Sequence, residues 1–502
     1  MNKPNILHLF TDQQRFDTIR ALGNPVIRTP SLDALARSGM AFTSAYTPSP
    51  VCVAARCSML HGQYPMRTGC YNNGPMPDDE RETFLDALAR AGYRTHGIGK
   101  CHFTPDPLAM KGFQSRVILE ELGCGKGSPY LPALAREGFG HVTEPHGIRN
   151  ELYYTPQVSQ LPQRLHPTQY VADRAIDFLR EDHGRPWYLY AGFIAPHPPF
   201  APPVPWNRLY RSPLMPMPHL PPGYEGLRTF VNLGQNRYKY KDAGRDANAM
   251  RTLKAYYYAC VSFVDYQVGR IVQALKDSGQ YDNTLIVFTS DHGELLGDYG
   301  CYGKRSMHDS CCRVPMLLSL PGVFEGGRTV DTPVSLVDVA PTLLSLAGAE
   351  FQTHQPDGVS LLDLPAERSV YSAFCFDQEA WGMRLADNPY PENLDLFSAS
   401  LTTYMIADER WKYFYSMPDQ KHFLFDRVND PKESANMAYV PCCRAARNEM
   451  QARLTAYLGA CGDTRALDGG DWRVTRRYEL PPEGAALFTH DAGGLLPEEY
   501  LP

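Results

Sequence analysis

The sequence lacks long apolar runs and clusters of basic residues. The longest apolar stretches, such as Met316–Leu320, are far too short to cross a bilayer. We therefore expect no membrane contact through a spanning segment. The 502 residues carry a formal net charge of −6 with no run of lysine and arginine. This charge pattern argues against a nucleic-acid partner.

The sequence also lacks Cys-x-x-Cys motifs and a recognisable leader. Its thirteen cysteines form no Cys-x-x-Cys zinc pattern, and their odd number and irregular spacing are typical of reduced thiols. Met1–Pro4 leads directly into the apolar run 5–10, which indicates a buried strand rather than a cleavable signal. Both features predict a cytoplasmic protein. The Gly-rich stretch 123–128 is not a phosphate-binding P-loop, because neither Ser nor Thr follows Lys126, and we expect a flexible turn there.

Strand-like and helix-like segments alternate along the first part of the chain, which predicts an α/β layered fold. The apolar runs predict strands at 5–10, 40–46, 93–97, 187–195, 284–288 and 313–319. The helical patterns predict helices at 30–38, 82–90, 168–180, 246–277 and 334–346. Between 104 and 167 periodicity is poor and Gly and Pro are frequent, so we expect a long surface insertion.

The pattern of predicted elements changes after about residue 363. A β-hairpin is predicted over 402–407 and 410–415, followed by a strand at 422–425 and a helix at 443–458. We therefore predict a domain at 1–365, a smaller α+β subdomain at 366–461 and an extended tail at 462–502. The tail is expected to pack on the body or on a neighbouring subunit of a homo-oligomer, because it would otherwise expose the apolar side chains of Trp472, Tyr478, Leu480, Leu487 and Phe488.

The most informative stretch is the predicted helix 52–61, which Pro50 precedes and Gly62 can end. Cys52 and Arg56 are four residues apart and share one face of this helix. Cys52 would lie at the helix N-terminus, where free N–H groups and the dipole favour negative charge. Arg56 adds a cation whose fork of donors suits an oxyanion. A tetrahedral anion is the expected ligand, although a buried structural cysteine would give the same five residues.

Two pairs of polar residues follow strong apolar strands. Asp12-Gln13 comes after the run 5–10, and Asp291-His292 comes after the run 284–288. Because parallel strands end at one edge of a sheet, these four side chains could meet near Cys52 and hold a hard divalent cation. The alternative is ordinary turn chemistry at each strand end. The similar triplet Asp182-His183-Gly184 follows a helix and is expected to be a plain loop.

The sequence resembles the sulfatase family over most of its length. The stretch from Cys52 to Arg56 resembles the family signature Cys-x-Pro/Ala-x-Arg, with Ala54 at the variable position. Gly99-Lys100-Cys101-His102, the Pro-rich segment with His197, and Arg313-Val314-Pro315 after Lys304 are similar to further family motifs. The residues that match in order are Asp12, Gln13, Cys52, Arg56, Lys100, His102, His197, Asp291, His292 and Lys304.

The resemblance implies a fold and an activity. The fold would be a large, mixed, mainly parallel sheet sandwiched by helices, with a short antiparallel sheet in the C-terminal subdomain. The activity would be hydrolysis of sulfate monoesters, in which a maturation enzyme oxidises Cys52 to formylglycine. The aldehyde hydrates to a diol whose one hydroxyl attacks sulfur and whose other hydroxyl later expels sulfate.

The resemblance also implies roles for the matching residues. Asp12, Gln13, Asp291, His292 and the modified Cys52 would hold one divalent metal, with Asp291 taking the nucleophile's proton. The cationic side chains of Arg56, Lys100 and Lys304 would bind the sulfate oxygens. His197 or His102 would protonate the leaving alcohol and contact the substrate.

The sequence departs from many sulfatases at two metal positions. Gln13 and His292 are closer to the choline-sulfatase and phosphonate monoester hydrolase branches, and an imidazole ligand admits Mn²⁺ beside the expected Ca²⁺. A phosphonate monoester or phosphodiester hydrolase on the same scaffold is therefore one alternative. A non-catalytic anion-binding protein with unprocessed Cys52 is another. The alcohol portion of the substrate stays open between sugar, aryl and alkyl groups, with aromatic residues at 153–154 and 206–210 as candidates for stacking.

Overall fold

We describe the protein from a computed structural model, which covers residues 3–121, 127–149, 152–240, 245–376 and 392–480. Its centre is an eight-stranded sheet with the order β5-β4-β6-β1-β7-β8-β2-β9. The four neighbouring strands β4, β6, β1 and β7 carry the functional edge, and the five strands from β5 to β7 in this order run parallel. The strands of this sheet are β1 (Asn5–Asp12), β2 (Met40–Phe42), β4 (Arg94–Gly99), β5 (Ser115–Ile118), β6 (Trp187–Pro196), β7 (Thr284–Ser290), β8 (Met316–Ser319) and β9 (Arg328–Val330).

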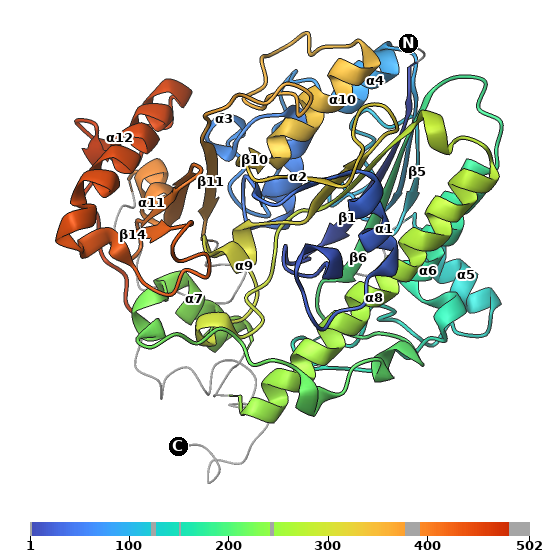
Figure 1. Ribbon diagram of the computed structural model, residues 1–502, viewed down its shortest axis with the longest axis horizontal. Helices are drawn as coiled ribbons and strands as arrows, with labels where there is room; N and C mark the ends of the chain where they lie inside the picture. The colour runs from blue at the N-terminus through green and yellow to red at the C-terminus, as the bar shows by residue number, and fades with distance from the viewer. Residues whose placement is uncertain (1–2, 122–126, 150–151, 241–244, 377–391, 481–502) are drawn as a thin grey trace.

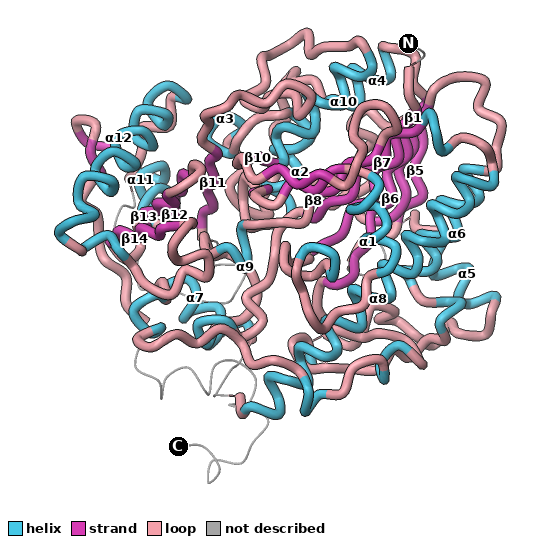
Figure 2. Tube along the Cα trace, in the orientation of Figure 1, coloured by secondary structure: helices cyan, strands magenta, loops and turns pink. Residues whose placement is uncertain are grey.

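Helices cover both faces of this sheet (Figures 1 and 2). One face carries α1 (Pro30–Ser38), α6 (Pro167–Leu179) and α8 (Ala247–Asp277), and the other carries α2 (Cys52–His61), α4 (Phe84–Arg90) and α10 (Val339–Ala347). In β1 the side chains alternate accordingly: Leu7 and Leu9 belong to the core under α1, α6 and α8, and Ile6 and Phe10 belong to the core under α2, α4 and α10. Because both faces are buried, these strands are almost continuously apolar, which made them visible in the sequence.

A second sheet is antiparallel and has the order β11-β12-β13-β14. Its strands are β11 (Val370–Cys375), β12 (Thr402–Ala407), β13 (Trp411–Ser416) and β14 (Lys421–Asp426), and α12 (Arg444–Cys461) packs against it. Figure 1 shows this unit beside the main sheet. The predicted fold class is therefore confirmed. The domain boundaries at 365 and 461 stay predictions.

The remaining elements are short. Two further two-stranded sheets pair β3 (Ala45–Tyr46) with β10 (Val334–Ser335) and β15 (Leu467–Asp468) with β16 (Asp471–Trp472). The remaining α-helices of the described residues are α3 (Pro65–Thr68), α5 (Tyr130–Arg136), α7 (Phe230–Gly234), α9 (Asp309–Cys312) and α11 (Leu394–Ser400), with short 3-10 turns between elements.

Some predicted elements differ from the structure. The strand expected at 40–46 is split between β2 and β3, which belong to different sheets, and the helix expected from 334 begins at Val339 after the short β10. The segment 104–167 is not only a surface insertion, because β5 within it pairs with β4 as an edge strand. Such long-range pairing leaves little trace in local periodicity. Most of the predicted turn at 123–128 lies outside the described residues.

The second sheet is tied to the main body by a buried ion cluster. The Lys412 ammonium of β13 lies 2.6 Å from the Asp309 carboxylate of α9 and also contacts Glu433. Asp309 follows the loop that carries Lys304, so the C-terminal unit supports one edge of the functional site. In the tail, Trp472 and Tyr478 are buried against this unit, while Leu487 and Phe488 lie outside the described residues.

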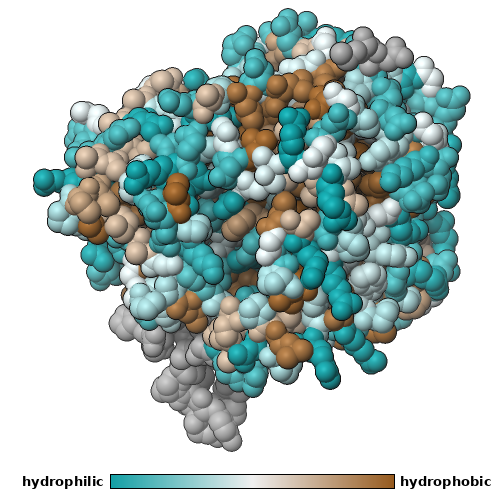
Figure 3. Space-filling model, in the orientation of Figure 1, coloured by the Kyte–Doolittle hydropathy of each residue, from teal (hydrophilic) through white to brown (hydrophobic). Residues whose placement is uncertain are grey.

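The outer surface is mixed in polarity. On the face drawn in Figure 3, hydrophilic residues are interspersed with smaller hydrophobic groups. Among the described residues, no helix has both the length and the apolar character that crossing a membrane requires.

Candidate active site

The site begins where β1 and β7 end side by side. These strands are parallel neighbours with Thr11 opposite Ser290, so Asp12 and Asp291 leave the sheet at the same edge. Gln13 then turns the chain with a φ of 67°, and its backbone N–H donates to Asp291 Oδ1 at 2.9 Å. A positive φ is uncommon outside glycine, and here the hydrogen bond to Asp291 accompanies it. Both carboxylates are fully buried.

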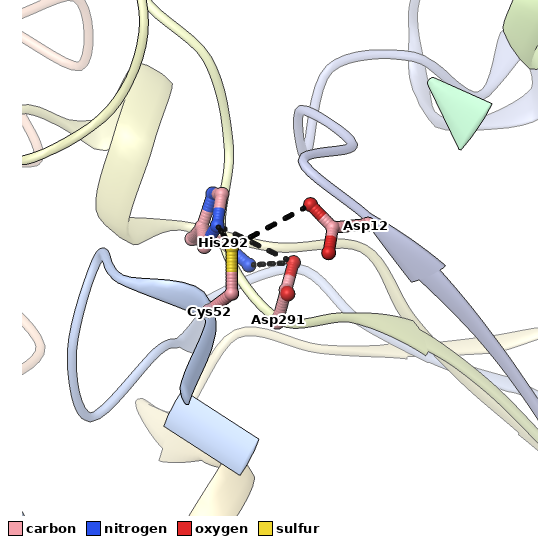
Figure 4. A group of neighbouring side chains, drawn as sticks. All are labelled: Asp12, Cys52, Asp291 and His292. Carbon is pink, nitrogen blue, oxygen red and sulfur yellow. Dashed lines mark hydrogen bonds and ion pairs between the residues drawn. The ribbon is translucent and has the colours of Figure 1, made fainter. Parts of the chain in front are cut away.

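Cys52 is the first residue of α2, and its sulfur points at this strand edge. Figure 4 shows Asp12, Cys52, Asp291 and His292 converging from two strand ends and a helix start. The Cys52 Sγ lies 3.8 Å from Asp12 Oδ1 and 3.2 Å from His292 Nε2. His292 Nδ1 donates to the Gly293 carbonyl oxygen at 2.9 Å, so Nε2 presents its lone pair to the site.

Arg56 lies one turn further along α2 and joins the two carboxylates. Its NH2 nitrogen is 3.0 Å from both Asp12 Oδ2 and Asp291 Oδ2, and its NH1 donates to the Tyr190 hydroxyl at 2.8 Å. The guanidinium is buried over the Phe10 ring. A guanidinium fits this position because its planar fork can satisfy several fixed oxygens at once.

Lys100 reaches the site from the end of β4. Gly99 before it has a φ of +86°, and a Cβ there would lie 2.1 Å from the Gly192 carbonyl oxygen. Only glycine therefore lets β4 pass this close to β6 and turn. The Lys100 ammonium is completely buried and lies 2.5 Å from Asp12 Oδ2. It also contacts the Glu121 carboxylate.

Lys304 approaches Cys52 from the loop between β7 and α9. Its Nζ lies 2.7 Å from the Cys52 sulfur. Burial and the Asp12 carboxylate oppose ionisation of the thiol, but Lys304, Lys100 and His292 outweigh them and lower the pKa of Cys52 well below its usual value. Burial opposes the charge on Lys304, but Cys52 and Asp12 raise its pKa above the ordinary value. The pocket therefore favours a negative group at position 52 facing a positive one at 304.

His197 follows β6 and faces the same pocket. Its Nδ1 donates to the Pro198 carbonyl oxygen at 2.7 Å, and its Nε2 lies 3.5 Å from Glu121 Oε1. Burial lowers the pKa of His197 well below its usual value, with Lys304 and Lys100 adding to the effect and Asp12 opposing it. The ring is therefore neutral in the free protein at neutral pH.

The His102 ring is not joined to the other predicted residues by a hydrogen bond or ion pair within the described part of the chain. Its φ is 57°, its backbone N–H donates to Glu120, and its Nδ1 is buried without a partner. The structure thus brings nine of the ten predicted residues into one contact network and leaves His102 at its edge.

The residues at the strand ends fit a divalent cation. Ligand atoms of Asp12, Cys52, Asp291 and His292 all lie within 4.8 Å of one another. The Gln13 Oε1 is buried without a hydrogen-bond partner, as a ligand oxygen would be before its cation binds. Burial and the neighbouring Asp12 raise the pKa of Asp291. Burial opposes ionisation of Asp12, but Lys100, His197, Lys304 and Arg56 hold its pKa well below the ordinary range. A cation between the two carboxylates would offset their mutual repulsion.

A second group of four ligand atoms, from Asp12, Cys52, Glu121 and His197, also lies within 4.8 Å. Here the Lys100 ammonium already contacts both carboxylates. The positive charge that such a cluster needs is therefore supplied by the chain itself.

Several contributing residues were missed in the sequence. Glu294 accepts hydrogen bonds from the Gln13 amide and, at 2.5 Å, from the Tyr154 hydroxyl. Its place three residues after Asp291 could have suggested this role. Glu121 lies in a segment without periodicity and gave no signal. Of the aromatic candidates, Tyr154 is buried in a core cluster and Trp206 packs on Phe263, whereas the Tyr153 ring lies 6.2 Å from that of His197.

Comparison with known proteins gives this geometry a context. The family described as Sulfatase matches residues 4–349, and the family described as N-sulphoglucosamine sulphohydrolase, C-terminal, matches residues 297–458. The chain belongs to the sulfatase family. This membership confirms the predicted enzyme class, a sulfuric ester hydrolase.

Three relatives show how far the likeness of this sulfatase extends. It is 31% identical to choline-sulfatase from Rhizobium meliloti, over 91% of this chain and 85% of that protein. It is 29% identical to an arylsulfatase from Clostridium perfringens, over 87% of this chain and 90% of that protein. The crystal structure of phosphonate monoester hydrolase of Agrobacterium radiobacter superposes with a TM-score of 0.75 at 26% identity, covering 91% and 95% of the two chains.

Proposed function

We propose that this sulfatase hydrolyses sulfate monoesters at a formylglycine formed from Cys52 by a maturation enzyme. One observation carries the proposal: the side chain of residue 52 lies among His292, Asp12 and the Lys304 ammonium, at the start of a helix. The Cys52 sulfur stands where an oxygen of the hydrated formylglycine would lie. A nucleophile in this position is held by cations on one side and faces the sheet edge on the other.

The proposed metal ligands are Asp12, Gln13, Asp291 and His292, together with the modified residue 52. Four of these five would offer oxygen ligands, which favours Ca²⁺, while the imidazole of His292 keeps Mn²⁺ open. A divalent cation bound there would make the nucleophile more acidic and offset the charge of the sulfate.

The chain's own side chains divide the remaining work. Lys100 and Lys304 are buried cations whose charge-assisted hydrogen bonds would stabilise the sulfate oxygens as charge builds up. Arg56 would take part through its positive charge, because its donors already bind Asp12, Asp291 and Tyr190. The raised pKa of Asp291 supports its part as acceptor of the nucleophile's proton. Among the predicted acids, His197 is favoured over His102, because its Nε2 faces the pocket and the anionic substrate would raise its pKa again.

Peptide mass spectrometry tests this proposal together with kinetics. Protein made in a host with the maturation enzyme should carry residue 52 with one sulfur and two hydrogens lost and one oxygen gained. Conversion should rise and fall with activity toward an aryl sulfate when the maturation enzyme is supplied or withheld. Full activity with unmodified Cys52 would contradict the mechanism, and an unmodified thiol in a competent host would favour the anion-binding alternative.

A phosphonate monoester or phosphodiester hydrolase is the second candidate. The likeness to phosphonate monoester hydrolase and the pair Gln13 and His292 favour it. The buried cation of Lys100 favours a compact sulfate instead, because it leaves no neutral space for a second organic substituent. The Tyr153 ring beside His197 already stacks on Tyr240 and lies under the Arg149 guanidinium, so the alcohol part of the substrate stays open between sugar, aryl and alkyl groups.

We also propose a cytoplasmic location. All twelve cysteines among the described residues are free thiols, which fits a reducing compartment. Association into a homo-oligomer through the tail after Gly462 remains part of the proposal.

A further inference from the structure

A carboxylate lies inside the proposed sulfate pocket, where an anion site would be expected to exclude one. Glu121 contacts the Lys100 ammonium, its Oε1 lies 3.5 Å from His197 Nε2, and its Oε2 lies 3.1 Å from the Arg149 guanidinium. Its side chain is only 13% exposed. Two of its three partners are residues that the reaction is proposed to use.

The neighbouring Glu120 shows what a structural carboxylate does in the same segment. Glu120 accepts hydrogen bonds from the backbone N–H groups of Cys101 and His102 at 3.0 and 3.1 Å, and so fixes the turn after β4. Glu121 contacts no backbone donor of that turn. Its contacts are with the charged or polar tips of Lys100, His197 and Arg149, so its main effect is on the charge of the pocket.

The charge of Glu121 affects substrates of different charge unequally. A sulfate monoester carries one negative charge, whereas a phosphate monoester at pH 8 carries two, because its second pKa is about 6. Lys100 is shared between Asp12 and Glu121, so it has less positive potential to offer a second substrate charge. At an effective dielectric constant of about 20, one extra charge within roughly 6 Å changes a rate or affinity by about ten- to a hundredfold.

We propose that Glu121 is a specificity-determining residue that favours monoanionic sulfate monoesters over dianionic phosphate monoesters. This inference rests on the proposed sulfatase function and adds a reason for its selectivity. The Glu121 carboxylate would distinguish esters by their charge and not by the size of their alcohol.

The experiment compares kcat/KM for 4-nitrophenyl sulfate and 4-nitrophenyl phosphate at pH 8 on matured full-length protein. Glu121→Gln keeps the shape and removes the charge, and should raise the phosphate-to-sulfate ratio by about tenfold or more. Glu121→Asp keeps the charge and should leave the ratio near that of the wild type. Glu137→Gln, which removes an exposed carboxylate paired with Arg164, is the matched control and should change nothing.

Arg149→Met provides an independent arm if Glu121→Gln does not fold, as a thermal melt would reveal. It removes a cation beside Glu121 and should lower the phosphate-to-sulfate ratio. An unchanged ratio, with both activities falling together, would make Glu121 a structural residue and overturn the inference alone. A wild type that cleaves no sulfate ester would overturn the proposed function and this inference with it.

Discussion

The ammonium of Lys304 lies 2.7 Å from the sulfur of Cys52, although the two residues are 252 positions apart. The contact joins the start of α2 to the loop that precedes α9. It contributes to the low pKa of Cys52 and so favours negative charge at residue 52.

Replacement of Lys304 by Met should lower kcat/KM for an aryl sulfate by about tenfold to hundredfold, because a buried charge-assisted contact is lost. Thermal melts should show a folded protein, since Met keeps the aliphatic length. Lys276→Ala at the exposed end of α8 is the control and should retain activity. Equal activity of Lys304→Met and the wild type would remove Lys304 from the mechanism.

Replacement of Gln13 by Met should weaken metal binding without preventing folding. The Gln13 Oε1 is buried without a partner, so its loss should weaken cation binding, while the lost amide hydrogen bond to Glu294 should appear as a lower melting temperature. We expect about tenfold or greater loss of affinity, measured by elemental analysis after chelation and stepwise return of Ca²⁺ or Mn²⁺. Gln14→Met alters the adjacent buried glutamine, whose amide donates to Thr18, and should keep the metal. Identical metal content in both variants would show that Gln13 is not a ligand.

Lys100 should distinguish sulfate from phosphonate esters. Lys100→Ala should lower kcat/KM for a sulfate monoester by about tenfold or more, and should harm a phosphodiester activity less. The reason is that this buried cation can contact a non-bridging oxygen only where no second organic group stands. Matched aryl sulfate and phosphonate esters on wild type and variant give the measurement. A wild type that prefers the phosphonate would favour the second candidate function.

Asp265 should make stability depend on pH. It lies on α8 and accepts the backbone N–H groups of Leu32 and Ser31 at the start of α1, at 2.7 and 3.2 Å. Burial nevertheless raises its pKa to about 7. The pKa of Asp265 is higher in the folded state than in the unfolded state. The protonated side chain therefore adds its full stabilisation to the free energy of unfolding below about pH 4, and this stabilisation is lost as the pH rises through 7.

Asp265→Asn should remove this dependence. Relative to the wild type, the variant should gain up to about 4 kcal/mol of unfolding free energy between pH 4 and pH 8, as urea titrations would measure. Asp277→Asn at the exposed end of the same helix is the control. A difference that stays constant with pH would show that Asp265 titrates normally.

The sequence by itself determined the elements and the types of chemical group. Strands β1, β6 and β7 are buried on both faces, so their apolar runs were visible locally, and the polar residues after them marked the functional edge. The i, i+4 spacing of Cys52 and Arg56 fixed their common helix face. The match of motif order then indicated the family, which the comparisons confirmed.

Only the tertiary structure decided which charges share the pocket. Glu121, Glu294 and Arg149 occupy segments with no helical or strand period, and their contacts with Lys100, Gln13 and Glu121 span 21 to 281 positions. The position of His102 was also decided by the tertiary structure, because this residue matches a motif yet lies at the edge of the contact network. The local hydrophobic periodicity of a sequence indicates which face of a helix or strand is buried. Which side chains meet across loops depends on how the whole chain packs.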